Sequence, residues 1–330
     1  MAEASLTAFL YKLIDYAGLF PPAKLDLDPA LRNYAAYRTS SESWMLGRFI
    51  IPSKRLAELA PFHDELFTQG EPWEFSILGR GGDTTDAFLA GLDADLAAIA
   101  DFRARHGERV TAEVLEVKLP ADVTSAADAA SVTRVLDSIA ERIDASGPPS
   151  LTPFLELPLA GNTTWRRDLQ TLVPALAAHE KQCVGRPRYR PAGLKLRCGG
   201  VEAAAFPTPD QIAAAIGIAR GAGVKLKCTA GLHHPVRHHN DSVQTKMHGF
   251  LNVFGAGILA AAGNVPESTL LEIISDETAA DFQFDDAGFG WRGQLRVPAS
   301  AVEAGRTFIT SYGSCSFDEP RDDLRALELL

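Results

Sequence analysis

Short apolar runs recur along the whole chain, and each is followed by a segment with the hydrophobic period of a helix. This alternation is typical of βαβ units on a parallel sheet. Eight strand-like runs are found, at residues 13–17, 46–51, 74–79, 112–118, 152–157, 193–198, 224–229 and 307–312. No central shift in composition and no linker rich in Pro, Gly or Ser divides them. The pattern therefore predicts a single (β/α)8 TIM barrel over residues 1–330, with a doubly wound parallel sheet as the alternative.

Start signals accompany the helical segments. Thr84 precedes the segment that contains "DAFLAGLDADL". The clearest signal is "TPDQ" at 208–211, where Thr208 suits the N-cap, Pro209 the first helical position and Gln211 a capping box. We therefore expect a helix to begin directly after Thr208.

The unit between the seventh and eighth strands is longer than the others. Its segment "MHGFLNVFGAGILAAAG" is typical of a buried helix, and "PESTLLEIISDETAADF" and the glycine-punctuated, aromatic "QFDDAGFGWRG" follow. We interpret residues 264–298 as an insertion within the barrel domain, made of an extra helix and a loop that acts as a lid. The alternative is an insertion that packs on the side of the barrel or forms an oligomer contact.

Alternation within the strands predicts which side chains face the helices and which face the barrel axis. In the sixth strand the apolar Leu194 and Leu196 face outward, so Lys195 and Arg197 face inward. The same argument applied to the fourth, fifth and seventh strands places further charged residues and one threonine on the inner face. These are Glu116, Lys118, Glu156, Lys225, Lys227 and Thr229.

So many charges are an unusual filling for a barrel, because a buried charge costs several kcal/mol unless it is paired. Cations outnumber anions five to two on this face, which favours a small anionic substrate that carries phosphate or carboxylate. For Lys195 and Lys225, pairing with the glutamates to plug the barrel is the competing interpretation. The others lie nearer the C-terminal strand ends, where barrel enzymes place their chemistry: Arg197, Lys227, Glu116, Lys118 and Glu156.

Crowded lysines indicate one particular chemistry. A lysine amine attacks a carbonyl only when unprotonated, and neighbouring cations in a desolvated pocket favour that form. Either Lys195 or Lys227 would then form a Schiff base while the other tunes it. Glu116 or Glu156 would serve as general acid or base. This hypothesis predicts an enzyme that acts on a small anionic carbonyl compound and needs no cofactor.

Three motifs in the second half of the chain resemble class I, Schiff-base aldolases of the deoxyribose-phosphate aldolase type. "KLRCG" places Lys195 before Gly199, "KCTAG" places Lys227 before Gly231, and "TSYGS" at 310–314 follows the last strand. The resemblance implies carbon–carbon lyase activity, with Lys195 as nucleophile, Lys227 as its neighbour and Glu116 as proton relay. It also implies a phosphate-binding loop that contains Ser311, Gly313 and Ser314.

The histidines support a second hypothesis, a metal site. Five of the eight histidines lie between residues 233 and 248. His233 and His234, together with Glu116 and Glu156, are candidate ligands of a divalent metal in an isomerase or hydrolase. The recognised zinc spacings are missing, however, and the two histidines also suit acid–base or anion-binding roles. The third hypothesis is a non-catalytic ligand-binding barrel whose inward charges pair internally.

Three further residues lie near the presumed active face. Asp15, at the end of the first strand, is a candidate carboxylate at the barrel mouth, and Arg48 in the second strand is a candidate substrate clamp. Cys315 is the only cysteine near this face. A nucleophilic role is open to Cys315, but the sequence identifies no base to pair with it.

Composition and charge limit the kinds of partner that we expect the protein to bind. The net charge of -10 and the pI near 5.3 argue against nucleic acid, which needs a basic surface. No apolar run reaches the roughly 18 residues of a transmembrane helix, and the N-terminal segment lacks the basic region of a signal peptide. We therefore expect a cytoplasmic protein without membrane partners, and homo-oligomer formation stays open. The four scattered cysteines indicate neither disulfides nor a zinc ribbon.

Overall fold

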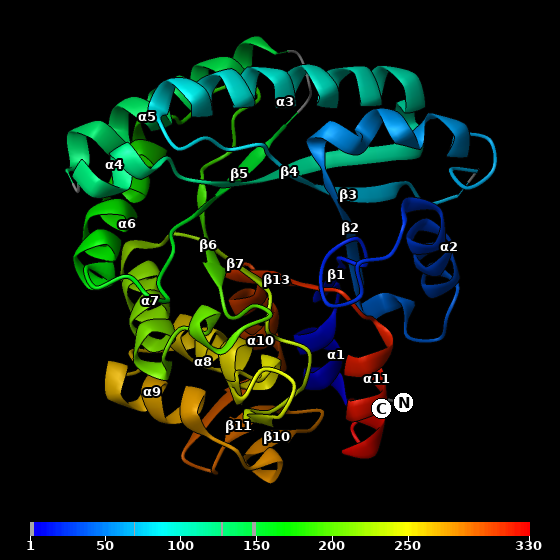
Figure 1. Ribbon diagram of the computed structural model, residues 1–330. Helices are drawn as coiled ribbons and strands as arrows, with labels where there is room; N and C mark the ends of the chain where they lie inside the picture. The colour runs from blue at the N-terminus through cyan, green and yellow to red at the C-terminus, as the bar shows by residue number, and fades with distance from the viewer. Residues whose placement is uncertain (1–2, 69, 127, 147–149) are drawn as a thin grey trace. The chain divides into compact units, whose positions relative to one another are not determined.

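Eight parallel strands form a closed barrel in the computed structural model, which describes residues 3–68, 70–126, 128–146 and 150–330. Their order is β1-β13-β7-β6-β5-β4-β3-β2 (Figure 1). This confirms the predicted TIM-like α/β barrel, whereas the doubly wound alternative is wrong because the sheet has no open edge. The barrel strands are β1 (Ile14–Tyr16), β2 (Leu46–Pro52), β3 (Trp73–Leu78), β4 (Val110–Lys118), β5 (Thr152–Glu156), β6 (Gly193–Arg197), β7 (Leu226–Thr229) and β13 (Ile309–Ser314).

The remaining elements surround or extend these strands in the sequence. The helices are α1 (Ala4–Leu10), α2 (Leu27–Arg38), α3 (Thr85–His106), α4 (Ala121–Ala126), α5 (Ala129–Ala145), α6 (Trp165–Gln182), α7 (Pro209–Ala222), α8 (Phe250–Ala262), α9 (Glu267–Ser275), α10 (Ala299–Arg306) and α11 (Asp318–Ala326). A 3-10 helix spans Ser53–Phe62. The short strands are β8 (His238–Asn240), β9 (Thr245–Met247), β10 (Phe282–Phe284), β11 (Gly288–Trp291) and β12 (Leu295–Pro298).

The chain divides into two compact units, each with its own core. Unit 2 comprises Arg48–Leu157 and Arg167–Lys195. In it, β3, β4, β5 and β6 pair in parallel, and α3 packs against α5 and β4 (Figure 1). Aromatic rings of Phe67, Trp73, Phe75 and Phe102 fill the core with centroid separations of 4.9 to 5.8 Å. Trp73 and Phe75 belong to β3, which pairs with β4, the strand that carries Glu116.

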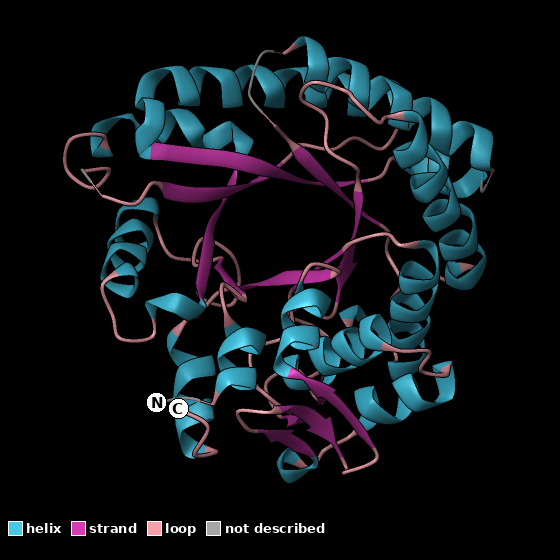
Figure 2. Cartoon of the chain, turned by 180° about the vertical axis from the view of Figure 1, so that it is seen from behind, coloured by secondary structure: helices cyan, strands magenta, loops and turns pink. Residues whose placement is uncertain are grey.

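Unit 1 comprises Met1–Gly47, Pro158–Arg166 and Leu196–Leu330. In it, β13 pairs in parallel with β1 on one side and β7 on the other. The apolar α8 packs between α7, α9 and α10, and this confirms the buried helix expected from its sequence. The antiparallel sheet β10–β11–β12 contacts α1, α8 and α10 (Figure 2). That residues 264–298 act as a lid stays a prediction.

The predicted capping box is present at the start of α7. The Thr208 side chain accepts a hydrogen bond from the Gln211 backbone, and the Gln211 side chain accepts one from the Thr208 backbone. Both bonds satisfy amides that have no partner within the helix. We expect Thr208→Ala to lower the free energy of unfolding by about 1 kcal/mol, measured by urea denaturation.

A matched substitution inside a helix provides the control for this prediction. Thr133 lies within α5, where alanine is the better helix former. Thr133→Ala should therefore leave the protein as stable as the wild type or slightly more stable. Equal losses at both positions would contradict a specific role of the cap.

Candidate functional site

Lys195 lies buried between two glutamates in unit 2. Its Nζ is 3.0 Å from a carboxylate oxygen of Glu116 and 3.0 Å from one of Glu156. Ser76 donates a further hydrogen bond of 2.6 Å to Glu116. Burial by itself lowers the pKa of Lys195, but the charges and hydrogen bonds of both glutamates outweigh burial and raise this pKa above its ordinary value.

This arrangement overturns the premise of the Schiff-base hypothesis. The sequence predicts cations around Lys195 and therefore a free amine at neutral pH. The structure instead places two carboxylates against the amine, which hold it as an ammonium without a lone pair. Lys195 thus matches the competing interpretation, in which it pairs with the glutamates inside the barrel sheet.

Lys227 is also part of a buried ion pair, in unit 1. Its Nζ donates to Asp15 and to the Ser311 hydroxyl at 3.3 Å, and Ser311 donates to Asp15 at 2.8 Å. Both charged side chains are almost completely buried. Asp15 was predicted at the barrel mouth, but here it neutralises Lys227 in the interior.

The remaining predicted residues differ in exposure. Lys225 precedes the first residue of β7 and is exposed, so the prediction that it faces inward is wrong. Lys118 and Arg197 are the last residues of β4 and β6, at the strand ends where the sequence predicts them, and both are exposed. Arg48 and Thr229 are half-buried, whereas Gly313 and Ser314 are buried at the end of β13. Substrate-binding roles for these residues stay predictions.

The chain turns sharply after β7 and brings His233 against the C-terminal part of unit 1. Ala230 and Gly231 both adopt positive φ angles, 58° and 70°. A Cβ on Gly231 would lie 2.7 Å from the Cα of Gly199, so this close approach requires glycine. Beyond the turn, His233 Nδ1 lies 3.2 Å from Glu319 and 3.8 Å from the sulfur of Cys315.

The contacts of His233 keep its imidazole charged. Burial, the largest single effect, lowers its pKa, but the hydrogen bonds and charges of Cys315 and Glu319 together raise the pKa to about 9. The same contact lowers the pKa of Glu319. His233 is therefore an imidazolium at neutral pH.

A second histidine–carboxylate pair follows directly. His234 Nδ1 lies 2.6 Å from a carboxylate oxygen of Asp323. The ring of His238 meets the ring of His234 edge-on, with 4.4 Å between their centroids. Glu319 and Asp323 are four residues apart and lie on one face of α11, so a single helix holds both imidazoles.

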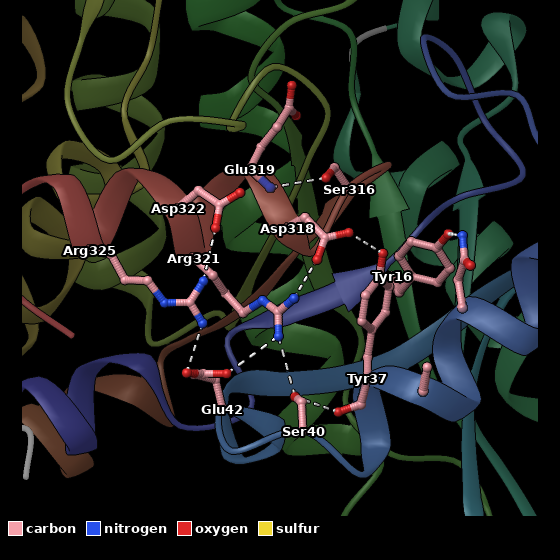
Figure 3. A network of polar contacts seen from close by, with 12 residues as sticks. Tyr16, Tyr37, Ser40, Glu42, Ser316, Asp318, Glu319, Arg321, Asp322 and Arg325 are labelled. Carbon is pink, nitrogen blue, oxygen red and sulfur yellow. Dashed lines mark hydrogen bonds and ion pairs between the residues drawn. The ribbon is translucent and has the colours of Figure 1, made fainter.

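The start of α11 is fixed to the region after α2 by a polar network (Figure 3). Arg321 contacts Asp318 and lies 3.4 Å from Glu42, and Arg325 bonds the other oxygen of Glu42 at 2.8 Å. Tyr37 donates to Asp318. This network positions α11, and with it the carboxylates that contact His233 and His234.

Both histidines line one small pocket of about 250 Å³ in unit 1. Val201, Val243 and Met247 give it an apolar wall, while Asn240, Ser242 and Glu319 add polar groups. Its volume lies slightly below the usual range for pockets that enclose drug-sized ligands. The pocket therefore suits a small ligand with both polar and apolar parts.

The alternative metal site is not formed as predicted. His233 and His234 contact Glu319 and Asp323, while Glu116 and Glu156 hold Lys195. Within residues 3–68, 70–126, 128–146 and 150–330, no group of three or more His, Cys, Asp or Glu side chains could hold a metal ion. Function without a cofactor stays a prediction.

Sequence reasoning missed Glu319 and Asp323 entirely and could not provide a partner for Cys315. The spacing of four between these two acids, on the last helix, was a usable signal. Their partners, however, lie about 90 residues earlier in the chain.

In the part of the chain that the structure describes, no helix is both long and apolar enough to cross a membrane.

Comparison with known proteins gives no family assignment. No protein-family model and no curated protein matches the chain. Among the solved structures that match is a mutant of the cellobiohydrolase Cel6A from Humicola insolens, in complex with methyl-tetrathio-alpha-d-cellopentoside. Its sequence is 13% identical, the match covers 66% of this chain and 67% of that chain, and the TM-score is 0.37. No activity is carried over at this level of similarity.

These findings correct the aldolase prediction. No family model and no curated protein supports the resemblance to deoxyribose-phosphate aldolases, and two carboxylates hold Lys195 as an ammonium. The predicted resemblance, the lyase class and the Schiff-base mechanism on an anionic carbonyl compound are therefore wrong. The barrel fold remains consistent with an enzyme.

Proposed function

We propose that the protein is an enzyme that uses the Cys315 thiolate as its nucleophile, with His233 as the paired acid–base group. The observation that carries this proposal is the 3.8 Å contact between Cys315 Sγ and His233 Nδ1, made where β13 ends. A nucleophile next to a base that a third group orients is the usual arrangement for covalent catalysis. Glu319 is the third group here, and it contacts the same nitrogen, Nδ1, at 3.2 Å, so it holds the imidazole beside the sulfur.

The charges at this site favour thiolate chemistry. An imidazolium beside a cysteine stabilises the thiolate, which is the reactive form. The Nδ1 proton of His233 lies within reach of both the sulfur and the Glu319 carboxylate. Among the described contacts, Nε2 of His233 has no protein partner, so its proton is available to a leaving group in the pocket that this histidine lines.

The chain contains a matched comparison in Cys183. Its sulfur lies 3.4 Å from Nε2 of His179, and Cys183 is 8% exposed while Cys315 is 7% exposed. The two sites differ in charge, because burial lowers the pKa of His179 and raises the pKa of the Cys183 thiol. Cys183 is therefore about as exposed as Cys315 and also contacts a histidine, but the imidazole of that histidine is neutral.

Alkylation tests the proposal directly. We expect iodoacetamide at pH 7 to modify Cys315 at least about ten times faster than Cys183, measured by quantitative peptide mass mapping over time. His233→Asn should remove most of this advantage because the imidazolium is lost. His179→Asn serves as the control and should leave the rate at Cys315 unchanged. Equal rates at the two cysteines, with no response to His233→Asn, would contradict the proposal.

A further inference from the structure

We propose that His234, oriented by Asp323, is the general base that activates water in a second reaction step, so that the enzyme hydrolyses small carboxylic esters. This inference rests on the proposed function of Cys315, because it assigns the group that releases the product from that cysteine. It adds a catalytic residue and a substrate class to the pocket that His233 lines, next to its contact with Cys315.

The contact with Asp323 fixes which nitrogen of His234 is the base. A carboxylate only accepts, so at 2.6 Å from Asp323 the Nδ1 of His234 is the nitrogen that donates. Nε2 is therefore the nitrogen that faces a reacting water, and among the described contacts Nε2 has no protein partner. His234 also lines the pocket and is partly exposed, so a water molecule can reach it.

The two neighbouring histidines are suited to opposite roles. His233, with a pKa of about 9, cannot accept a proton from water at neutral pH. It therefore serves the first step, as an acid. The charged and titratable groups around His234 are Asp323 and Glu319 on α11, together with His233 and His238 on its own segment. Two titratable groups with different environments in one pocket are a common basis for acid and base assignments.

The reaction balances with water as the only co-reactant. In the first step the Cys315 sulfur bonds the acyl carbon, the ester C–O bond breaks, and His233 gives its proton to the departing alcohol. In the second step His234 takes a proton from water, the new C–O bond forms, and the C–S bond breaks to return the thiolate. The proton on His234 returns to His233 through solvent. The sum is ester plus water to carboxylic acid plus alcohol.

The pocket walls indicate the kind of ester. Val201, Val243 and Met247 offer apolar contact to a short acyl chain, and Asn240 and Ser242 offer hydrogen bonds to a polar end. A volume of about 250 Å³ leaves room for a chain of a few carbons. 4-Nitrophenyl butyrate combines such a chain with a leaving group that is measured by absorbance, and it is the probe for the experiment.

Stopped-flow kinetics with this probe separate the two steps. In His234→Gln we expect a burst of one nitrophenolate per enzyme, followed by a steady-state rate at least about 100-fold below the wild type. A butyryl group should accumulate on Cys315 and be found by peptide mass mapping. The control, His239→Gln, alters an exposed histidine of the same segment and should match the wild type.

The outcomes distinguish the two proposals. Turnover that persists in Cys315→Ala overturns the proposed function and this inference with it. A wild type that does not hydrolyse the probe overturns this inference alone, because the alkylation test of Cys315 does not depend on the ester. If Cys315→Ala is inactive while His234→Gln keeps its steady-state rate, only the role of His234 is overturned. Loss of the burst in folded His234→Gln also overturns that role, because His234 would then act in the first step.

Discussion

Lys195→Met is expected to lower the free energy of unfolding by about 3–5 kcal/mol, measured by urea denaturation. The substitution removes the ammonium that lies 3.0 Å from both Glu116 and Glu156. Two carboxylates then remain buried close together without their shared cation. The loss is large because a carboxylate that has left water needs either a compensating charge or a proton.

Lys225→Met is the control for this measurement. Lys225 lies two residues before the Lys227 position and is exposed, so its replacement should change stability by no more than about 0.5 kcal/mol. Similar small effects for both lysines would show that Lys195 contributes no buried ion pair. A large loss at Lys195 alone supports a structural role for this residue.

The second large effect is a dependence of stability on pH that requires His233. The pKa of His233 is raised from 6.5 to about 9 in the folded protein, which corresponds to about 3 kcal/mol. Because the folded value is higher, this contribution is fully present below pH 6.5 and is lost as the pH rises through 9. The lowered pKa of Glu319 acts oppositely, since its contribution is lost as the pH falls through its folded value.

Urea denaturation of the wild type and His233→Asn across pH 6 to 10 measures this effect. The stability difference between them should be largest at pH 6, the low end of this range, and should shrink steadily toward pH 10. His239→Asn, at an exposed position, should show no such trend. A difference for His233→Asn that stays constant with pH would mean that the imidazole is neutral in the folded protein.

The fold could be predicted because its determinants are local and repeated. Each strand has its own apolar alternation, most strands are followed by a segment with a helical period, and some helices have a start signal, as at Thr208. The observed strand ends lie within about two residues of the predicted ones. Eight such units in series favour barrel closure, since parallel strands need a helix between them.

The alternation argument held only where the backbone is a strand. It correctly placed Lys195, Glu116, Glu156 and Lys227 on a buried face. It failed for Lys225, because β7 begins only at Leu226 and the period of two does not extend beyond the strand. A one-residue difference in where a strand begins therefore decided whether a charge is buried or solvated.

By itself the sequence determined the barrel and the polar residues at its strand ends, and only the tertiary structure decided their chemistry. The protonation state of a side chain depends on the few charges within hydrogen-bonding distance. For Lys195 these came from two other strands, and for His233 and His234 from α11. Local patterns do not record which distant side chains meet, so the ammonium of Lys195 and the partner of Cys315 emerged only when the chain was folded.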